Sequence, residues 1–117
     1  MEIPENKLIS GRSFSWTNHA RLKMRQYSLS EQRVKRVANH PERVEEGVAP
    51  RTTAAMQKAG TSKKHHEIWV MFQEVKLRNE KQKRIISAWR YPGATKPGRP
   101  LPQEIISEIE QATEAEE

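Results

Sequence analysis

Apolar side chains recur at helical spacing near the start of the chain, at Trp16, Ala20, Met24 and Tyr27. This spacing predicts a short helix over residues 18–26, with Thr17 or Asn18 as its N-cap. A second helix is predicted from Ser30, a good N-cap, to the segment before Pro41, because proline disfavours helical geometry at the preceding residue. The two helices are expected to pack as a hairpin.

After Pro41 the apolar positions alternate, which is typical of strands. A weak alternation surrounds Gly47, and clearer strands are predicted at 52–58, 67–75 and 83–91. The strand at 67–75 has apolar residues on both faces, which predicts a central position in the sheet. On the last strand, simple alternation places Arg84, Ile86, Ala88 and Arg90 on one face.

These patterns divide the chain into four segments. Residues 1–13 lack periodicity and are expected to be flexible, and residues 14–92 form one domain. Residues 93–101 hold two glycines and two prolines, which predicts an extended linker. Pro102 opens an acidic C-terminal helix and tail over 102–117, with an apolar stripe at Ile105, Ile109 and Ala112. The predicted class is α+β: two N-terminal helices, then a three- or four-stranded antiparallel meander, then a C-terminal helix.

Charge is unevenly distributed along the 117 residues, which have a net charge of +6. All 21 Lys and Arg residues lie between Lys7 and Arg99, whereas six of the 15 acidic residues lie between Glu104 and Glu117. A basic body indicates a polyanionic partner, most often nucleic acid. The acidic end is interpreted either as a solvated tail or as a segment that covers the basic face.

Composition also narrows the class of protein. The chain has no cysteine, which excludes disulfides and thiolate metal sites and fits a cytoplasmic location. No apolar run approaches the length of a membrane span, so no membrane partner is expected.

Three short segments resemble a known family: Phe14-Ser15-Trp16 with His19-Ala20-Arg21, the stretch 29–41, and Arg84-Ile85-Ile86-Ser87-Ala88. They resemble the RelE/ParE-type toxin superfamily, and most closely the BrnT-like toxins and related uncharacterised small proteins. The last segment is similar to the "R-I-I-S-A-R" strand of BrnT-like proteins. Here Trp89 stands where those proteins have arginine after the alanine, and Arg90 follows one place later. The resemblance covers residues 14–92.

The resemblance implies a RelE-like fold and a toxin that cleaves RNA, either ribosome-bound or free mRNA. It also implies a partner protein, an antitoxin that neutralises the toxin.

RNA can be cleaved without a metal ion when a base, an acid and cations surround the reacting phosphate. Arg84 and Arg90 are the candidates for gripping phosphate, because a guanidinium binds it bidentately. His19 is a candidate acid or base, and the alternative is a helix-start histidine that bonds a backbone group. Tyr91 could act as a weak acid or a stacking platform, or simply be an aromatic residue at the edge of the core.

Further cations are expected to contact nucleic acid: Arg21, Lys23, Arg25, Lys63, Lys64, Lys83, Lys96 and Arg99. Trp16, Trp69 and Trp89 are expected to lie mostly in the core. If one of them is exposed and stacks on a base, Trp89, which lies among cations, is the best candidate. The neighbouring His65 and His66 point to opposite faces of a strand, so a shared metal ion is not expected there. We therefore expect no metal and no cofactor.

Three functions remain open from the sequence. The first is a toxin-like, metal-independent endoribonuclease. The second is a non-catalytic nucleic-acid-binding module or regulator. The third is an interaction protein whose acidic C-terminal helix docks on another chain or on its own basic face.

Overall fold

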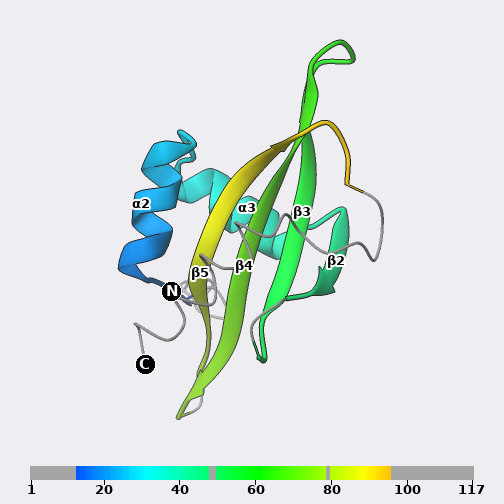
Figure 1. The fold of residues 1–117 in the computed structure, drawn as a ribbon. Coiled ribbons are helices and arrows are strands. Elements are labelled where there is room, and N and C mark those ends of the chain that lie inside the picture. Colours follow the sequence, from blue (N-terminus) through cyan, green and yellow to red (C-terminus); the bar gives the residue numbers. More distant parts are fainter. Residues whose placement is uncertain (1–12, 48–49, 79, 96–117) are drawn as a thin grey trace, which may run out of the picture.

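The computed structural model describes residues 13–47, 50–78 and 80–95 of the chain. In this part, five strands form one mixed sheet in the order β1-β5-β4-β3-β2, and two short helices pack on one face of the sheet (Figure 1). The strands are β1 (Ser13–Trp16), β2 (Arg43–Glu46), β3 (Thr53–Gly60), β4 (His65–Leu77) and β5 (Glu80–Pro92), and the helices are α2 (Asn18–Gln26) and α3 (Glu31–Asn39). Neither helix is long and apolar enough to cross a membrane.

The predicted class, two N-terminal helices followed by an antiparallel meander and a C-terminal helix, is wrong. The described residues are mostly strand, and β1 precedes both helices. It pairs in parallel with β5, from Ser13 opposite Gln82 to Trp16 opposite Ile85, which makes the sheet mixed. Four residues are too few for a clear alternation, and a partner so far along the chain leaves no local signal. Of the predicted flexible N-terminus only Ser13 is described, and it belongs to β1. Residues 1–12, the predicted linker from residue 96 on and the predicted acidic C-terminal helix lie outside the described residues.

Both helices begin and end as their capping residues predict. The Thr17 hydroxyl accepts a hydrogen bond from the Ala20 N–H (3.0 Å) and donates one to the Ile86 carbonyl of β5 (3.2 Å). The Ser30 hydroxyl accepts one from the Arg33 N–H (3.1 Å). Thr17 therefore caps α2 and also ties the start of that helix to the sheet.

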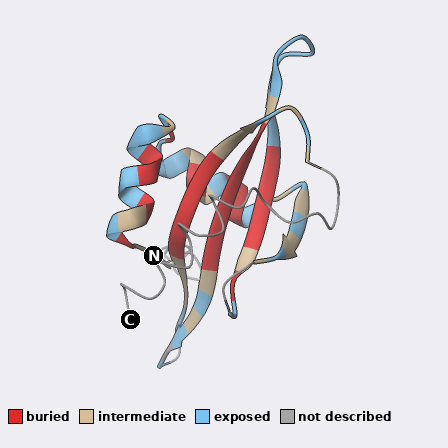
Figure 2. Ribbon diagram, viewed as in Figure 1, coloured by how far each residue is buried: buried red, intermediate tan, exposed pale blue. Residues whose placement is uncertain are grey.

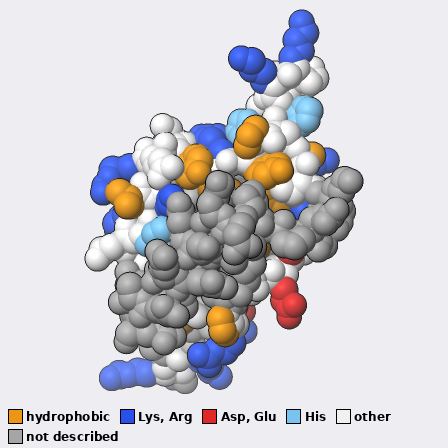
Figure 3. All heavy atoms as spheres, viewed as in Figure 1, with side chains coloured by type: hydrophobic (Ala, Val, Ile, Leu, Met, Phe, Trp, Pro, Cys, Tyr) orange, Lys and Arg blue, Asp and Glu red, His pale blue; other side chains and the backbone are white. Residues whose placement is uncertain are grey.

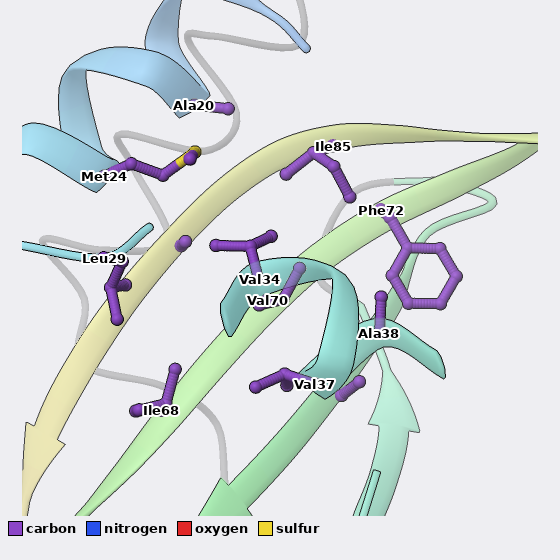
Figure 4. Packing of buried hydrophobic residues seen from close by; sticks show 12 residues of the cluster. Ala20, Met24, Leu29, Val34, Val37, Ala38, Ile68, Val70, Phe72 and Ile85 are labelled. Atoms are coloured by element: carbon purple, nitrogen blue, oxygen red, sulfur yellow. The ribbon is translucent and has the colours of Figure 1, made fainter. Parts of the chain in front are cut away.

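The face of the sheet beneath the helices forms the larger part of the core (Figure 4). Buried residues from both helices and from β3, β4 and β5 interlock there: Ala20, Met24, Leu29, Val34, Val37, Ala38, Ala55, Ile68, Val70, Phe72, Ile85 and Ala88. Leu29 and Val34, which stand on either side of the Ser30 cap at the positions of a hydrophobic staple, are both in this set. Packing of the apolar stripes is what holds such short helices in place.

The opposite face carries a second apolar cluster, which we call the tryptophan face. It consists of Ala54, Met56, Trp69, Met71, Ile86 and Trp89. Trp69 and Trp89 stand opposite each other and stack, with ring centroids 6.2 Å apart and an interplanar angle of 7°. Buried positions run along the middle of β3, β4 and β5 (Figure 2). Because β4 contributes to both clusters, its predicted central position is confirmed.

A β-bulge in β5 separates residues that simple alternation would place together. Met71 pairs with Ser87 but Phe72 pairs with Ile85, so Ile86 is an extra residue in β5. As a result Ile85 and Ala88 both face the helices. The prediction that Arg84 and Arg90 share a face is wrong, because the bulge lies between them and reverses the alternation.

Candidate nucleic-acid interface

Cationic side chains lie along one end of the molecule, on the β3–β4 turn, the end of β5 and the start of α3. We call this region the basic end and define it by Arg33, Lys63, Lys64, His65, His66 and Arg90. Antiparallel pairing places Gly60 opposite His65, and Ile68 opposite Arg90. Figure 3 shows Lys and Arg side chains at the tip of this hairpin, with histidine side chains directly below them.

The β3–β4 turn projects two lysines into solvent. Gly60 adopts a φ of 89°, and a Cβ at this position would lie 2.3 Å from the Lys64 carbonyl oxygen. Glycine is therefore required for this close turn. The turn is closed by the Thr61 N–H donating to the Lys64 carbonyl (3.2 Å) and the Lys64 N–H donating to the Thr61 hydroxyl (3.0 Å). The side chains of Lys63 and Lys64 remain exposed.

The Arg90 side chain bonds to the backbone between α2 and α3 and does not project into solvent. Its Nε donates to the Tyr27 carbonyl (2.7 Å) and its Nη2 to the Ser28 carbonyl (3.2 Å), at the C-terminal end of α2. Its Nη1 lies 2.8 Å from His66 Nε2. A cation suits this helix end, where unpaired carbonyls carry partial negative charge. Arg90 is therefore a positioning residue for His66, and its donors are directed at protein atoms.

The electrostatic potential around His66 is positive. Arginine can only donate hydrogen bonds, so His66 Nε2 accepts from Arg90 and the imidazole proton resides on Nδ1. Burial lowers the pKa of His66, and the nearby charges of Arg90, Arg33 and His65 lower it further. The charged groups that shift this pKa are all cationic. The same potential that disfavours a proton on His66 attracts an anion.

Arg33 contributes a buried N–H donor that has no acceptor among the described residues. Its side chain is half-buried on α3. Its Nε is buried and has no hydrogen-bond partner among the described residues. A buried donor without an acceptor is costly, and a phosphate oxygen is the kind of acceptor that a guanidinium binds well.

The two arginines predicted to grip one phosphate lie apart. Arg84 pairs with Gln73 and with Ser15 of β1, on the side of the bulge away from Arg90. The six-residue separation along β5 corresponds to about 20 Å. Arg84 is half-buried on the tryptophan face, whereas Arg90 faces the helices. The structure therefore does not bring them together.

The predicted acid–base residues are also separated. His19 is half-buried in the first turn of α2, which Thr17 ties to β5 at Ile86. Tyr91 is half-buried near the other end of β5, opposite Glu67, and packs against the tryptophan face. His19 and Tyr91 therefore lie near different parts of β5, and with Arg84 and Arg90 also apart the catalytic set predicted from the sequence is not assembled.

Where the structure describes them, the residues predicted to contact nucleic acid are exposed, ion-paired or buried. Lys63, Lys64 and Arg25 are exposed. Arg21 forms an ion pair with Glu31 (3.1 Å) and lies 5.5 Å above the Trp16 ring, and Lys83 is paired with Glu74 (3.4 Å).

Two predicted contacts are buried instead. Lys23 is buried and its Nζ donates to Gln26 Oε1 (3.2 Å). Trp89 is only 2% exposed, so it lies in the core and is not placed to stack on a base. Lys96 and Arg99 lie outside the described residues.

Sequence reasoning missed Arg33 and His66 as parts of the interface. The sequence analysis did not expect His66 to hold a metal ion, and it assigned the contact with nucleic acid to the preceding Lys63 and Lys64. Within the described ranges no group of three or more His, Cys, Asp or Glu side chains is placed to hold a metal ion. The link between Arg33 and His66 depends on how α3 lies on the sheet, which no local pattern encodes.

A pocket of about 320 Å³ lies away from the basic end, next to the turn that precedes β3. It is lined by Arg51, Gln73, Glu74, Val75 and Lys76. None of these is among the predicted site residues, and the pocket does not extend the basic end.

Comparison of this chain with family models, with curated proteins and with solved structures finds no match in any of the three.

Proposed function

We propose that this chain is a nucleic-acid-binding protein that grips the phosphate backbone at its basic end, without a catalytic acid–base pair. The observation that carries the proposal is the set of cations that act on His66: Arg90 Nη1 lies 2.8 Å from its Nε2, the charges of Arg33 and His65 also lower its pKa, and no acidic side chain is among the charges that shift it. Lys63 and Lys64 on the projecting turn would make the outer phosphate contacts.

A polyanion suits this surface better than a single small anion. The exposed lysines stand on the hairpin turn, whereas Arg33 lies at the start of α3 in the body of the molecule. Cations spread in this way match successive phosphates along a strand. We place this function in the cytoplasm, where a cysteine-free chain meets RNA in a reducing environment.

The test is binding of labelled RNA and DNA oligonucleotides at several salt concentrations, followed by fluorescence anisotropy. The variant K63Q/K64Q should bind more weakly, and the slope of log K against log salt should fall by about 1 to 2, because each phosphate contact contributes ~0.7–0.9. The matched control is K76Q/K81Q, which removes the exposed cross-strand lysine pair at the opposite hairpin.

The control should retain most of the parent affinity. Equal losses in the two double variants would show that binding is not local to the basic end. Absence of any salt-sensitive binding by the parent would remove the proposed function.

A second candidate is a toxin-like, metal-independent endoribonuclease that a partner antitoxin neutralises. The observation in its favour is His66, whose lowered pKa favours the neutral imidazole next to Arg90 and within range of the Arg33 charge. It predicts growth arrest and new mRNA ends on induced expression in bacteria, and loss of both in an H66A variant. Binding without new RNA ends would favour the non-catalytic function.

A further inference from the structure

The tryptophan face is buried, although no described helix packs on it. Trp69 and Trp89 are 1% and 2% exposed, and Met71 is 0% exposed. Both described helices pack on the opposite face, over β3, β4 and β5 (Figures 1 and 4). Six apolar side chains, two of them tryptophans, form this cluster. A monomer rarely leaves such a continuous apolar patch open to solvent, so we expect another segment to cover it.

The chain itself turns onto this face after β5. The Gly93 N–H donates to the His65 carbonyl (3.1 Å), and Gly93 has a φ of 84°. Thr95 then donates from its N–H and its hydroxyl to the two Glu67 oxygens, at 3.2 and 2.8 Å. Its own carbonyl and hydroxyl accept from Arg43 of β2, at 3.0 and 2.7 Å.

These bonds determine where the rest of the chain starts. Glu67 shares its face with Trp69, and the Arg43 guanidinium lies 5.0 Å above the Trp69 ring. Thr95, the last described residue, therefore lies at the tryptophan face.

The indole N–H of Trp89 is a second, independent indication that another segment packs on the tryptophan face. Its Nε1 is buried and has no hydrogen-bond acceptor among the described residues. In contrast, Trp69 Nε1 donates to Glu67 (2.8 Å). A buried indole N–H usually has an acceptor, so the group that covers the face is expected to provide one.

The sequence after Thr95 has the length and pattern to be this cover. Six residues link it to Pro102 and span at most about 20 Å when extended, whereas four neighbouring strands span only about 15 Å. The stripe of Ile105, Ile109 and Ala112 would lie on one side of a helix, with Ser107 and Gln111 on the other.

We propose that residues 102–112 form a helix that docks on the tryptophan face through Ile105, Ile109 and Ala112. The sheet then lies between α2 and α3 on one side and this helix on the other, which gives the second apolar cluster its cover. The proposal does not depend on what the basic end binds.

The experiment is a paramagnetic relaxation measurement on the full chain. The chain has no cysteine, so a single S107C substitution gives one spin-label position on the outer side of the helix. The label should broaden the indole N–H signals of Trp69 and Trp89. Trp16, which packs with the cluster beneath the helices, is the internal control and should be affected less.

Equal or absent effects on the three indole signals would overturn the proposal. Mixing labelled chain with unlabelled, ¹⁵N-enriched chain tests for a second copy as the cover, since broadening would then appear between molecules. That outcome would also overturn it.

A matched pair of variants gives a second readout in the full chain. I105D/I109D should increase acrylamide quenching of tryptophan fluorescence, because it places charges on the docking stripe. S107D/Q111D adds the same charge to the outer side and should leave quenching unchanged. Equal quenching by both variants and the parent would contradict the docking.

Discussion

The two faces of the sheet satisfy their buried polar groups in different ways. Beneath the helices, side chains of the sheet cap helix ends: Arg90 binds carbonyls at the end of α2, and Gln57 Nε2 donates to the His40 carbonyl at the end of α3 (2.8 Å). On the tryptophan face, Glu67 collects donors from Trp69 and Thr95 and lies 3.7 Å from Arg43.

This difference shows what each face contributes. On the face that the helices cover, which we call the helix face, the side-chain donors bond to neutral main-chain carbonyls. Any sequence with helices in these positions would offer such acceptors. The tryptophan face depends on one buried carboxylate, 2% exposed, that only its particular partners can satisfy. We therefore expect substitutions to be more costly on the tryptophan face.

The largest effect is expected for Glu67→Ala. Removing this carboxylate leaves the Trp69 and Thr95 donors without their acceptor and removes one of the two carboxylates near Arg43, so stability should fall by about 3–5 kcal/mol. Urea unfolding measures the loss. The matched control is Glu45→Ala, which removes the more exposed partner of Arg43 and should cost about 1 kcal/mol or less. Similar losses would remove the distinction between the two carboxylates.

A smaller effect is expected for Arg90→Ala on the helix face. Three charged hydrogen bonds are lost at a partly exposed corner, so the free energy of unfolding should fall by about 2 kcal/mol. Arg90→Lys keeps the charge but cannot reach all three acceptors, and an intermediate loss is expected. If the alanine variant were as stable as the parent, the positioning role of Arg90 would be wrong.

Gln57→Met should cost about 1 kcal/mol in urea unfolding. The substitution keeps the size of the side chain but removes the donor to the carbonyl at the end of α3. Gln73→Met on the neighbouring strand β4 serves as the control, and its stability should be close to that of the parent. A larger loss at Gln73 than at Gln57 would contradict the capping role.

The smallest effect is expected from the titration of His66, whose environment is partly solvent-screened. Its folded-state pKa is lowered, so below about pH 6.5 the unfolded chain binds a proton that the folded chain resists. The stabilising contribution is complete above that pH and is lost as pH falls through the folded pKa. His66→Gln keeps an acceptor for Arg90 and should flatten this part of the stability profile between pH 7.5 and pH 5, approximately.

An unchanged profile in His66→Gln would show that other groups carry the pH dependence. Replacing the exposed neighbour His65 by Gln is the matched control, and it should preserve most of the slope.

The local features of the fold could be predicted from short patterns. Thr17 and Ser30 cap the two helices, and alternation located β4 and β5. These elements follow from interactions between residues a few positions apart, which a pattern can display.

The missing features depend on residues far apart. The parallel pairing of β1 with β5 was not predicted, and neither was the extra residue at Ile86. The predicted phosphate site was wrong for this reason, because it assumed an unbroken alternation from Arg84 to Arg90, and the extra residue Ile86 lies between them.

The sequence by itself determined the basic character of the body, the positions of both helices and the presence of strands with apolar residues on both faces. Only the tertiary structure decided which cations meet. It assigned Arg90 to the end of α2, separated Arg84 from it across a bulge, and brought Arg33 near enough to His66 for its charge to lower the pKa of the imidazole. The physical reason is that composition and local periodicity act over neighbouring residues, whereas a site is formed by strand register and helix packing.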